Sequence, residues 1–105
     1  MIKGGDKMKV YISGAITGVK DYKKDFERGV YYWFDKYVNY QNIKNPVWFC
    51  RHLPQNSTWE QYMRVCVKEL ADCDKIYMLK GWENSRGATE EHRIAKMLGL
   101  EVIYE

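Results

Sequence analysis

The fold of this chain is decided first by the stretch Lys9-Val10-Tyr11-Ile12-Ser13-Gly14-Ala15-Ile16-Thr17-Gly18. Its first half is rich in β-branched and aromatic residues, which predicts a short strand over residues 9–13. Small residues and glycines follow at once, and they predict that the strand ends in a loop over residues 14–18. The other elements have to be arranged around this strand and its loop.

One helix and a weaker strand are expected next. Apolar side chains recur at helical spacing after Asp21, which predicts an amphipathic helix over residues 22–37 with this aspartate as its N-cap. The recurring residues are Phe26, Val30, Trp33 and Tyr37. A weak strand is expected over residues 38–44, and the two prolines that follow predict a loop over residues 46–56.

The second helix has a marked start. The run Ser57-Thr58-Trp59-Glu60 has the pattern of a capping box, in which the first hydroxyl and the last carboxylate each accept a backbone hydrogen bond. One face of that helix is apolar and consists of Trp59, Met63, Cys66, Leu70 and Cys73. Beyond it we expect a strand over residues 76–79, a loop over 81–87, a helix closed by Gly99 and a last strand over 101–104.

Strands and helices therefore alternate, and right-handed crossovers between them give an α/β fold with a parallel sheet. We expect a small doubly wound three-layer sandwich, flavodoxin-like or Rossmann-like, with four parallel strands. Residues 8–105 are expected to form this single domain, preceded by a flexible leader over residues 1–7. Ligands of such sheets lie beyond the carboxyl ends of the strands, so residues 13–18 and 80–87 are the candidate binding loops.

Composition excludes several classes of protein. With 46% apolar, 30% charged and 15% aromatic residues and only 2 Pro, the chain is neither a disordered tail nor a collagen-like repeat. No stretch approaches the ~18 apolar residues of a membrane-spanning helix, and the N-terminus lacks the apolar run of a signal peptide. We therefore expect a cytoplasmic protein with no membrane partner.

The charged and metal-ligating residues indicate neither a nucleic-acid polymer nor a metal. The net charge is only +3, and the basic residues are scattered, which does not favour a polymer. Cys50, Cys66 and Cys73 contain no Cys-x-x-Cys pair, and we expect reduced thiols packed as small apolar groups. His52 and His92 do not stand at metal-ligand spacing with them, so no metal or other cofactor is expected.

The last helix carries an acidic residue on its apolar side. Its inward face is defined by Ala88, Ala95 and Leu98. Glu91 falls on the same face, where a carboxylate is costly unless it has a partner or a role. Near a helix N-terminus and the mouth of the sheet, its anionic form suits a nucleophile or the stabilisation of a cation. The alternative is that Glu91 caps its own helix or pairs with Arg86.

Five segments of the chain match a known family. They are residues 9–18, Asn45-Pro46, Trp59-Glu60-Gln61-Tyr62-Met63, residues 73–79 and Gly81-Trp82-Glu83-Asn84-Ser85-Arg86-Gly87-Ala88-Thr89-Glu90-Glu91. Through them the chain resembles the nucleoside 2-deoxyribosyltransferase-like superfamily, in particular its short bacterial and phage proteins of unassigned function. Catalytic members of that superfamily cleave the N-glycosidic bond of 2′-deoxynucleosides or their 5′-monophosphates, as transferases or as hydrolases.

The resemblance implies roles for individual residues. Glu91 matches the glutamate that attacks the anomeric carbon, and Tyr11 matches a tyrosine that orients it. Ser85 matches a position at which the monophosphate glycosidases carry a serine that meets the 5′-phosphate. Ligand contacts are expected at Ser13, Gly14 and Ala15 in the first loop and at Trp82, Ser85, Arg86 and Gly87 in the second.

Some side chains near the loops have two interpretations. Trp82 is expected to stack on a nucleobase or to pack at an interface, whereas packing is expected for Trp59. Arg86 is expected to bind phosphate at a helix N-terminus or to pair with a nearby acid. Glu83 is a candidate for the acid that protonates a departing base.

Cys66 departs from the superfamily's pattern, because active members carry there an aspartate that binds the sugar and assists acid chemistry. A thiol performs neither task well, so two hypotheses about a ligand site stay open, beside a third in which the chain is a structural or interaction protein built on this fold. In the first, the protein is an N-glycosidase or deoxyribosyltransferase with Glu91 as nucleophile. In the second, it is a non-catalytic binder or sponge of a nucleotide-derived signal. Under both, the resemblance implies a homo-oligomer that binds a small nucleoside or nucleotide.

Overall fold

Four short parallel strands form one sheet in the computed structural model, which describes residues 8–36 and 38–105. The strands are β1 (Val10–Ser13), β2 (Ile43–Lys44), β3 (Lys75–Met78) and β4 (Glu101–Tyr104), in the order β2-β1-β3-β4. From β1 the chain first adds β2 on one side and then β3 and β4 on the other, so the sheet is doubly wound. The predicted leader over residues 1–7 lies outside the described residues.

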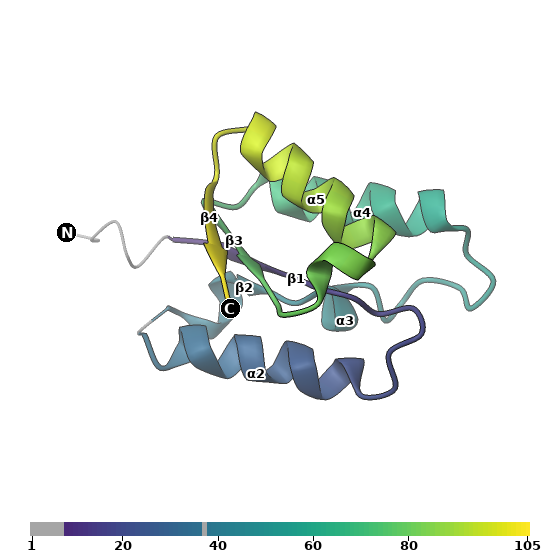
Figure 1. Ribbon diagram of the computed structural model, residues 1–105, viewed down its shortest axis with the longest axis horizontal. Coiled ribbons are helices and arrows are strands. Elements are labelled where there is room, and N and C mark those ends of the chain that lie inside the picture. The colour runs from purple at the N-terminus through teal and green to yellow at the C-terminus, as the bar shows by residue number, and fades with distance from the viewer. Residues whose placement is uncertain (1–7, 37) are drawn as a thin grey trace.

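Helices cover both faces of this sheet (Figure 1). α2 (Tyr22–Phe34) lies on one face, and α4 (Trp59–Ala71) and α5 (Arg86–Met97) lie together on the other. A short helix, α3 (Pro46–Phe49), follows β2. The prediction of a small three-layer α/β sandwich is therefore confirmed. Within the described residues, no helix has both the length and the apolar character needed to cross a bilayer.

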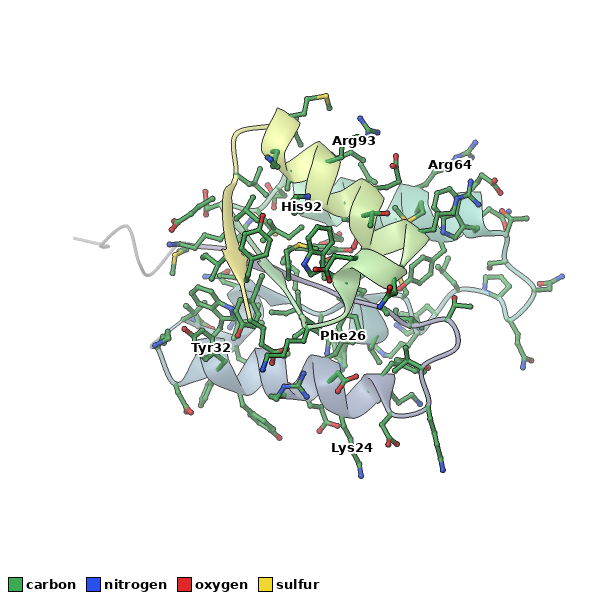
Figure 2. All side chains as sticks on the ribbon, viewed as in Figure 1. Lys24, Phe26, Tyr32, Arg64, His92 and Arg93 are labelled. Atoms are coloured by element: carbon green, nitrogen blue, oxygen red, sulfur yellow. The ribbon has the colours of Figure 1, made fainter. Side chains whose placement is uncertain are left out.

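Side chains of β1 alternate between two cores, as the period of a strand requires. Val10 and Ile12 face α2 and pack in a core that includes Phe26. Figure 2 shows Phe26 between α2 and the sheet. Tyr11 faces the opposite way, into the core formed with α4 and α5. Because side chains two apart share a face, Ser13 lies on the Tyr11 side of the sheet.

α2 packs closely on β1, and it ends earlier than residue 37, where the sequence predicted its end. A Cβ atom added at Gly29 would lie 3.1 Å from Ile12 Cγ2, so the glycine permits the close approach. Phe34 is the last helical residue, and the chain then turns to bury Val38 in the core. Asp21 stands at the N-cap position as predicted, although its side chain accepts no hydrogen bond from the helix amides.

The predicted strand over residues 38–44 is reduced to the two residues of β2. A 3₁₀ helix over Tyr40–Asn42 precedes it. The Asn39 side chain starts that turn by accepting a hydrogen bond from the Gln41 amide at 3.1 Å. Such local bonds from asparagine compete with strand pairing.

The predicted loop over residues 46–56 begins instead with α3. The Asn45 side chain caps this helix by accepting a hydrogen bond from the Val47 amide at 3.1 Å. Pro46 occupies the first helical position, where its missing N–H costs nothing and its fixed φ is already helical. The proline therefore starts a helical turn here rather than excluding one.

α4 begins with a capping box one residue later than predicted. The Thr58 hydroxyl accepts a hydrogen bond from the Gln61 amide at 3.1 Å, and the Gln61 side chain accepts one from the Thr58 amide at 2.8 Å. Ser57 instead donates its hydroxyl to the Pro54 carbonyl at 2.6 Å. The sequence contains two overlapping boxes, because glutamine fills the last position as well as glutamate.

The last two strands and the helix between them agree closely with the sequence. β3 is shifted by one residue from the predicted 76–79, and β4 has the predicted bounds. Gly99 follows α5 in the left-handed conformation, with φ +80°, as expected for a residue that ends a helix. Leu98 was expected on the inward face, but it is the C-cap of α5 and is 48% exposed.

Candidate functional site

The carboxylate of Glu91 is buried between two hydroxyl groups of β1. Only 5% of this residue is exposed. Its Oε2 accepts a hydrogen bond from the Tyr11 hydroxyl at 2.6 Å, and its Oε1 accepts one from the Ser13 hydroxyl at 2.7 Å. Both of its oxygens are thus held by β1, as the resemblance implied for Tyr11.

Neither simple alternative for Glu91 describes its position. The N-terminus of α5 is capped by Ser85, whose hydroxyl accepts a hydrogen bond from the Ala88 amide at 3.1 Å. The Arg86 guanidinium lies over the ring of Trp59, 3.6 Å from its centroid. The Glu91 carboxylate therefore lies inward against the sheet, where the apolar stripe of α5 predicted it.

Burial and hydrogen bonding have opposite effects on the pKa of Glu91. Burial raises the pKa of its carboxyl to about 7, and hydrogen bonds from Tyr11, Ser13 and Cys66 oppose the rise. Burial also raises the pKa of Tyr11 well above its ordinary value, and the charge of Glu91 adds to that effect. Tyr11 therefore stays protonated and donates, while Glu91 is divided between its acid and its carboxylate near neutral pH.

A cavity of about 620 Å³ lies at this carboxylate, and its volume is in the range typical of small-molecule sites. Most of its lining comes from three parts of the chain, and Phe26 of α2 and Pro46 of α3 add to it. The loop after β1 supplies Gly14, Ile16 and Thr17, the first turns of α4 supply Thr58, Trp59, Tyr62 and Met63, and the second loop with α5 supplies Asn84, Ser85, Arg86, Gly87, Ala88 and Glu91. Both predicted binding loops thus reach one cavity at the carboxyl edge of the sheet.

The charge inside the cavity is concentrated on two side chains. Among the described residues that line it, Glu91 is the only acid and Arg86 the only base. Arg86 and Trp59 are the first residues of α5 and α4, so their stack joins the N-termini of two helices. The amides of a helix N-terminus favour anions. The cavity thus has an acidic inner end and a cationic, anion-favouring mouth.

Four residues expected near the ligand do not line this cavity. One is Ser13, which is fully buried and donates its hydroxyl to Glu91. Trp82 stacks on His92, with 4.3 Å between ring centroids, and borders a separate hollow beside β4 together with Glu83. Glu83 therefore does not line the cavity at Glu91. Ala15 is half-buried in the first loop and is not among the lining residues.

The first turns of α4 are the part of the site that the sequence reasoning missed. Trp59 was expected to pack in its helix, but it is half-buried and lines the cavity. The capping box already located this helix N-terminus. In a β-α-β unit the N-terminus of a helix follows the carboxyl end of a strand, so its first turn lies at the ligand-binding edge. Applying that rule to the box would have placed Trp59 and Tyr62 at the site.

Cys66 is fully buried in the core with Tyr11, as expected for a small apolar group. Its sulfur lies 3.8 Å from that of Cys50, and all three cysteines are free. Within residues 8–36 and 38–105, no group of three or more His, Cys, Asp or Glu side chains could hold a metal ion.

Comparison with known proteins gives one match. A family model described as a domain of unknown function (DUF4406) matches residues 8–104. No curated protein and no solved structure matches the chain significantly.

Proposed function

The chain belongs to the DUF4406 family, a family of unknown function, and we propose from its own site that it is an N-glycosidase of nucleosides or nucleotides. The observation that carries the proposal is the buried Glu91 carboxylate, held by Tyr11 and Ser13 at the inner end of the cavity. The resemblance to the nucleoside 2-deoxyribosyltransferase-like superfamily supports the same reaction, with a 2′-deoxynucleoside 5′-monophosphate as the expected substrate.

In the proposed reaction, one Glu91 oxygen attacks the anomeric carbon of the sugar. The bond from carbon to oxygen forms as the bond from carbon to the base nitrogen breaks, and the base leaves with the electron pair. Water then hydrolyses the glycosyl ester and frees the carboxylate. The departing base takes its proton from solvent, because Glu91 is the only acid among the described lining residues. Transfer to a second base instead of water is the alternative outcome of the same intermediate.

The mouth of the cavity suits the two ends of a nucleotide. Arg86 and the N-terminal amides of α5 supply the positive charge that a 5′-phosphate requires. Trp59 and Tyr62 supply aromatic surface for a base. We therefore assign base stacking to these rings rather than to Trp82, which borders a different hollow.

The test is incubation with a panel of deoxynucleosides and their 5′-monophosphates, followed by chromatography for free base. The wild-type protein is expected to release base, and Glu91→Gln to release none. Glu90→Gln is the matched control, because Glu90 is the adjacent residue and pairs on the outside with Arg93 at 2.9 Å. Absence of release by the wild type, or equal release by Glu91→Gln, would contradict an enzymatic function.

A second candidate function is binding without turnover. It is favoured by Cys66 at the position of the superfamily's aspartate and by the lack of a second acid among the described lining residues. A nucleotide would then raise the Tm of the protein without losing its base. Cys66→Asp separates the two candidates, since base release gained by this variant would identify a site that has lost one catalytic group. No stabilisation by any nucleotide would contradict both.

We also propose that the protein acts in the cytoplasm and as a homo-oligomer. Three free thiols fit a reducing compartment. Several large aromatic side chains are exposed, which fits a surface that a second copy covers. They include Tyr31, Phe34, Tyr40 and Trp48. Light scattering that reports only the mass of a single chain would contradict the oligomer.

A further inference from the structure

Two cysteine thiols from different helices meet beside Glu91. Cys50 is the C-cap of α3 and Cys66 lies in the middle of α4, and their sulfurs are 3.8 Å apart. A disulfide has an S–S distance of about 2.05 Å, so a small movement of one side chain closes the gap. We propose that Cys50 and Cys66 form an oxidation site at which a hydroperoxide converts the two thiols into a disulfide.

The two thiols differ in access. Cys50 is half-buried and ends a four-residue helix, beyond which residues 51 and 52 are exposed. Cys66 is fully buried. The oxidant therefore reaches Cys50 first, and Cys66 is the partner that resolves the oxidised sulfur. Because Cys50 stands at a helix end next to a loop, its backbone can shift as its sulfur moves toward that of Cys66.

Their ionisation follows the same order. The hydrogen bond from Cys66 lowers the pKa of Cys50, although burial opposes this. The same bond raises the pKa of Cys66, and burial and the nearby charge of Glu91 raise it further. Since the thiolate is the nucleophile, Cys50 is also the thiol that reacts with peroxide.

The oxidation balances in two steps. The Cys50 thiolate attacks one peroxide oxygen, the O–O bond breaks, and Cys50 becomes a sulfenic acid. The other peroxide oxygen takes a proton from solvent and leaves as an alcohol or water. The Cys66 sulfur then attacks the Cys50 sulfur, the S–S bond forms, the S–O bond breaks, and water leaves with the thiol proton. The peroxide gains two electrons, and the two sulfurs lose them.

The disulfide would also affect Glu91. The Cys66 thiol has one proton, which it can donate either to Cys50 or to Glu91, and donation to Glu91 lowers the pKa of that carboxyl. Oxidation removes this proton and leaves Tyr11 and Ser13 as the donors to Glu91, so the pKa of Glu91 rises. It also ties α3 to the middle of α4, whose first turns line the cavity. The oxidation site is independent of the proposed function, whereas its effect on base release rests on that function.

The test treats the full-length reduced protein with a small molar excess of hydrogen peroxide, blocks free thiols under denaturing conditions and maps peptides by mass spectrometry. We expect one linked peptide pair joining Cys50 to Cys66, a mass loss of two hydrogens and reversal by dithiothreitol. Cys50→Ser and Cys66→Ala are expected to lose the link. Cys73→Ser is the matched control and is expected to keep it, because Cys73 is engaged elsewhere, with the Glu69 carbonyl.

Two results would overturn the proposal. One is oxidation of Cys50 to sulfinic acid, or a link between two chains, with no link to Cys66. The other is that the peptides containing Cys50 and Cys66 keep their reduced masses after peroxide treatment, as the peptide containing Cys73 does. Cys50→Ser leaves the buried Cys66 in place. It therefore tests the proposal even if Cys66→Ala does not fold. If the link forms but no base is released from any nucleotide, the oxidation site stands and the glycosidase proposal fails.

Discussion

At the scale of single residues, the Glu91 carboxyl is easier to bury as an acid than as an anion. Its folded pKa of about 7 exceeds its ordinary value of 4.5. The folded protein therefore holds this proton more tightly than the unfolded chain, and stability falls as the pH rises from below 4.5 through about 7. The ionised form is expected to cost about 3 kcal/mol of the free energy of unfolding above that range.

Glu91→Gln lacks this cost at every pH. Relative to the wild type, the variant is therefore expected to gain stability between about pH 5 and about pH 8. Urea unfolding across this range measures the difference. Glu90→Gln is the control, because the hydrogen bond from Arg93 lowers the pKa of Glu90. The stability of this variant relative to the wild type should therefore not increase as the pH rises. A difference for Glu91→Gln that is constant with pH would contradict a buried, titrating Glu91.

Tyr11 favours the Glu91 carboxylate by donating a hydrogen bond to it. Tyr11→Phe removes this donor, so the pKa of Glu91 is expected to rise above about 7. If base release requires ionised Glu91, the midpoint of its pH profile rises as well, and activity near neutral pH falls several-fold for each pKa unit. Tyr62→Phe removes a hydroxyl from the same cavity and is expected to leave the midpoint unchanged. An unshifted midpoint in Tyr11→Phe would exclude the proposed role of this hydroxyl.

At the scale of elements, the start of α4 offers a choice between two capping residues. Thr58→Ala removes the hydroxyl that caps the helix and is expected to cost about 1 kcal/mol of the free energy of unfolding. Ser57→Ala removes a hydroxyl that only holds the preceding turn, and we expect a smaller loss. Chemical denaturation of both variants compares them. A larger loss in Ser57→Ala would favour the box predicted from the sequence.

The elements that the sequence predicted well are those fixed by tertiary burial patterns. The strand of residues 9–13 and the helices on either face were found because their apolar spacing reflects packing. The errors lie where a local side chain competes with the pattern, as Asn39 and Asn45 do by starting turns. Periodicity does not report such competition, because it depends on single hydrogen bonds to the backbone.

At the scale of the whole molecule, the inner end of the cavity at Glu91 could be predicted from the sequence, whereas the aromatic residues at its mouth could not. Glu91 could be found because an acid on an apolar stripe is visible within one helix. Trp59 lines the cavity although packing was expected for it, and Trp82 stacks on His92. What each ring faces depends on how α4, α5 and β4 pack together. Spacing along one element gives no measure of that packing, so only the α/β topology itself could have located the rings.

An ion pair between Arg28 and Glu105 joins α2 to the end of β4 in the sheet. The Arg28 guanidinium binds both Glu105 oxygens, one of them at 2.9 Å, and the same carboxylate accepts a hydrogen bond from the Lys80 amide at 2.9 Å. Arg28 and this amide lower the pKa of Glu105. The contribution of Glu105 is therefore present above its ordinary pKa of 4.5 and is lost as the pH falls through its lower folded pKa.

Glu105→Gln is accordingly expected to lower the free energy of unfolding by about 0.5–1 kcal/mol near neutral pH, the range for partly exposed ion pairs. The loss should shrink in acid, and also at high salt, which screens the pair. Glu101→Gln, which removes the partner of Lys75 on the same strand, gives a comparison. A loss in Glu105→Gln that persists unchanged in acid would show that the charge of Glu105 is not its source.

The two hydrogen bonds at Glu91 connect distant parts of the chain. Ser13 precedes Glu91 by 78 positions and Tyr11 precedes it by 80. During synthesis Tyr11 and Ser13 are therefore made well before Glu91. No partly made chain can therefore hold a complete site, since a chain that lacks α5 lacks the acid altogether. Whatever ligand the cavity takes, its binding to a nascent or truncated chain reports that the last crossover of the sheet has closed.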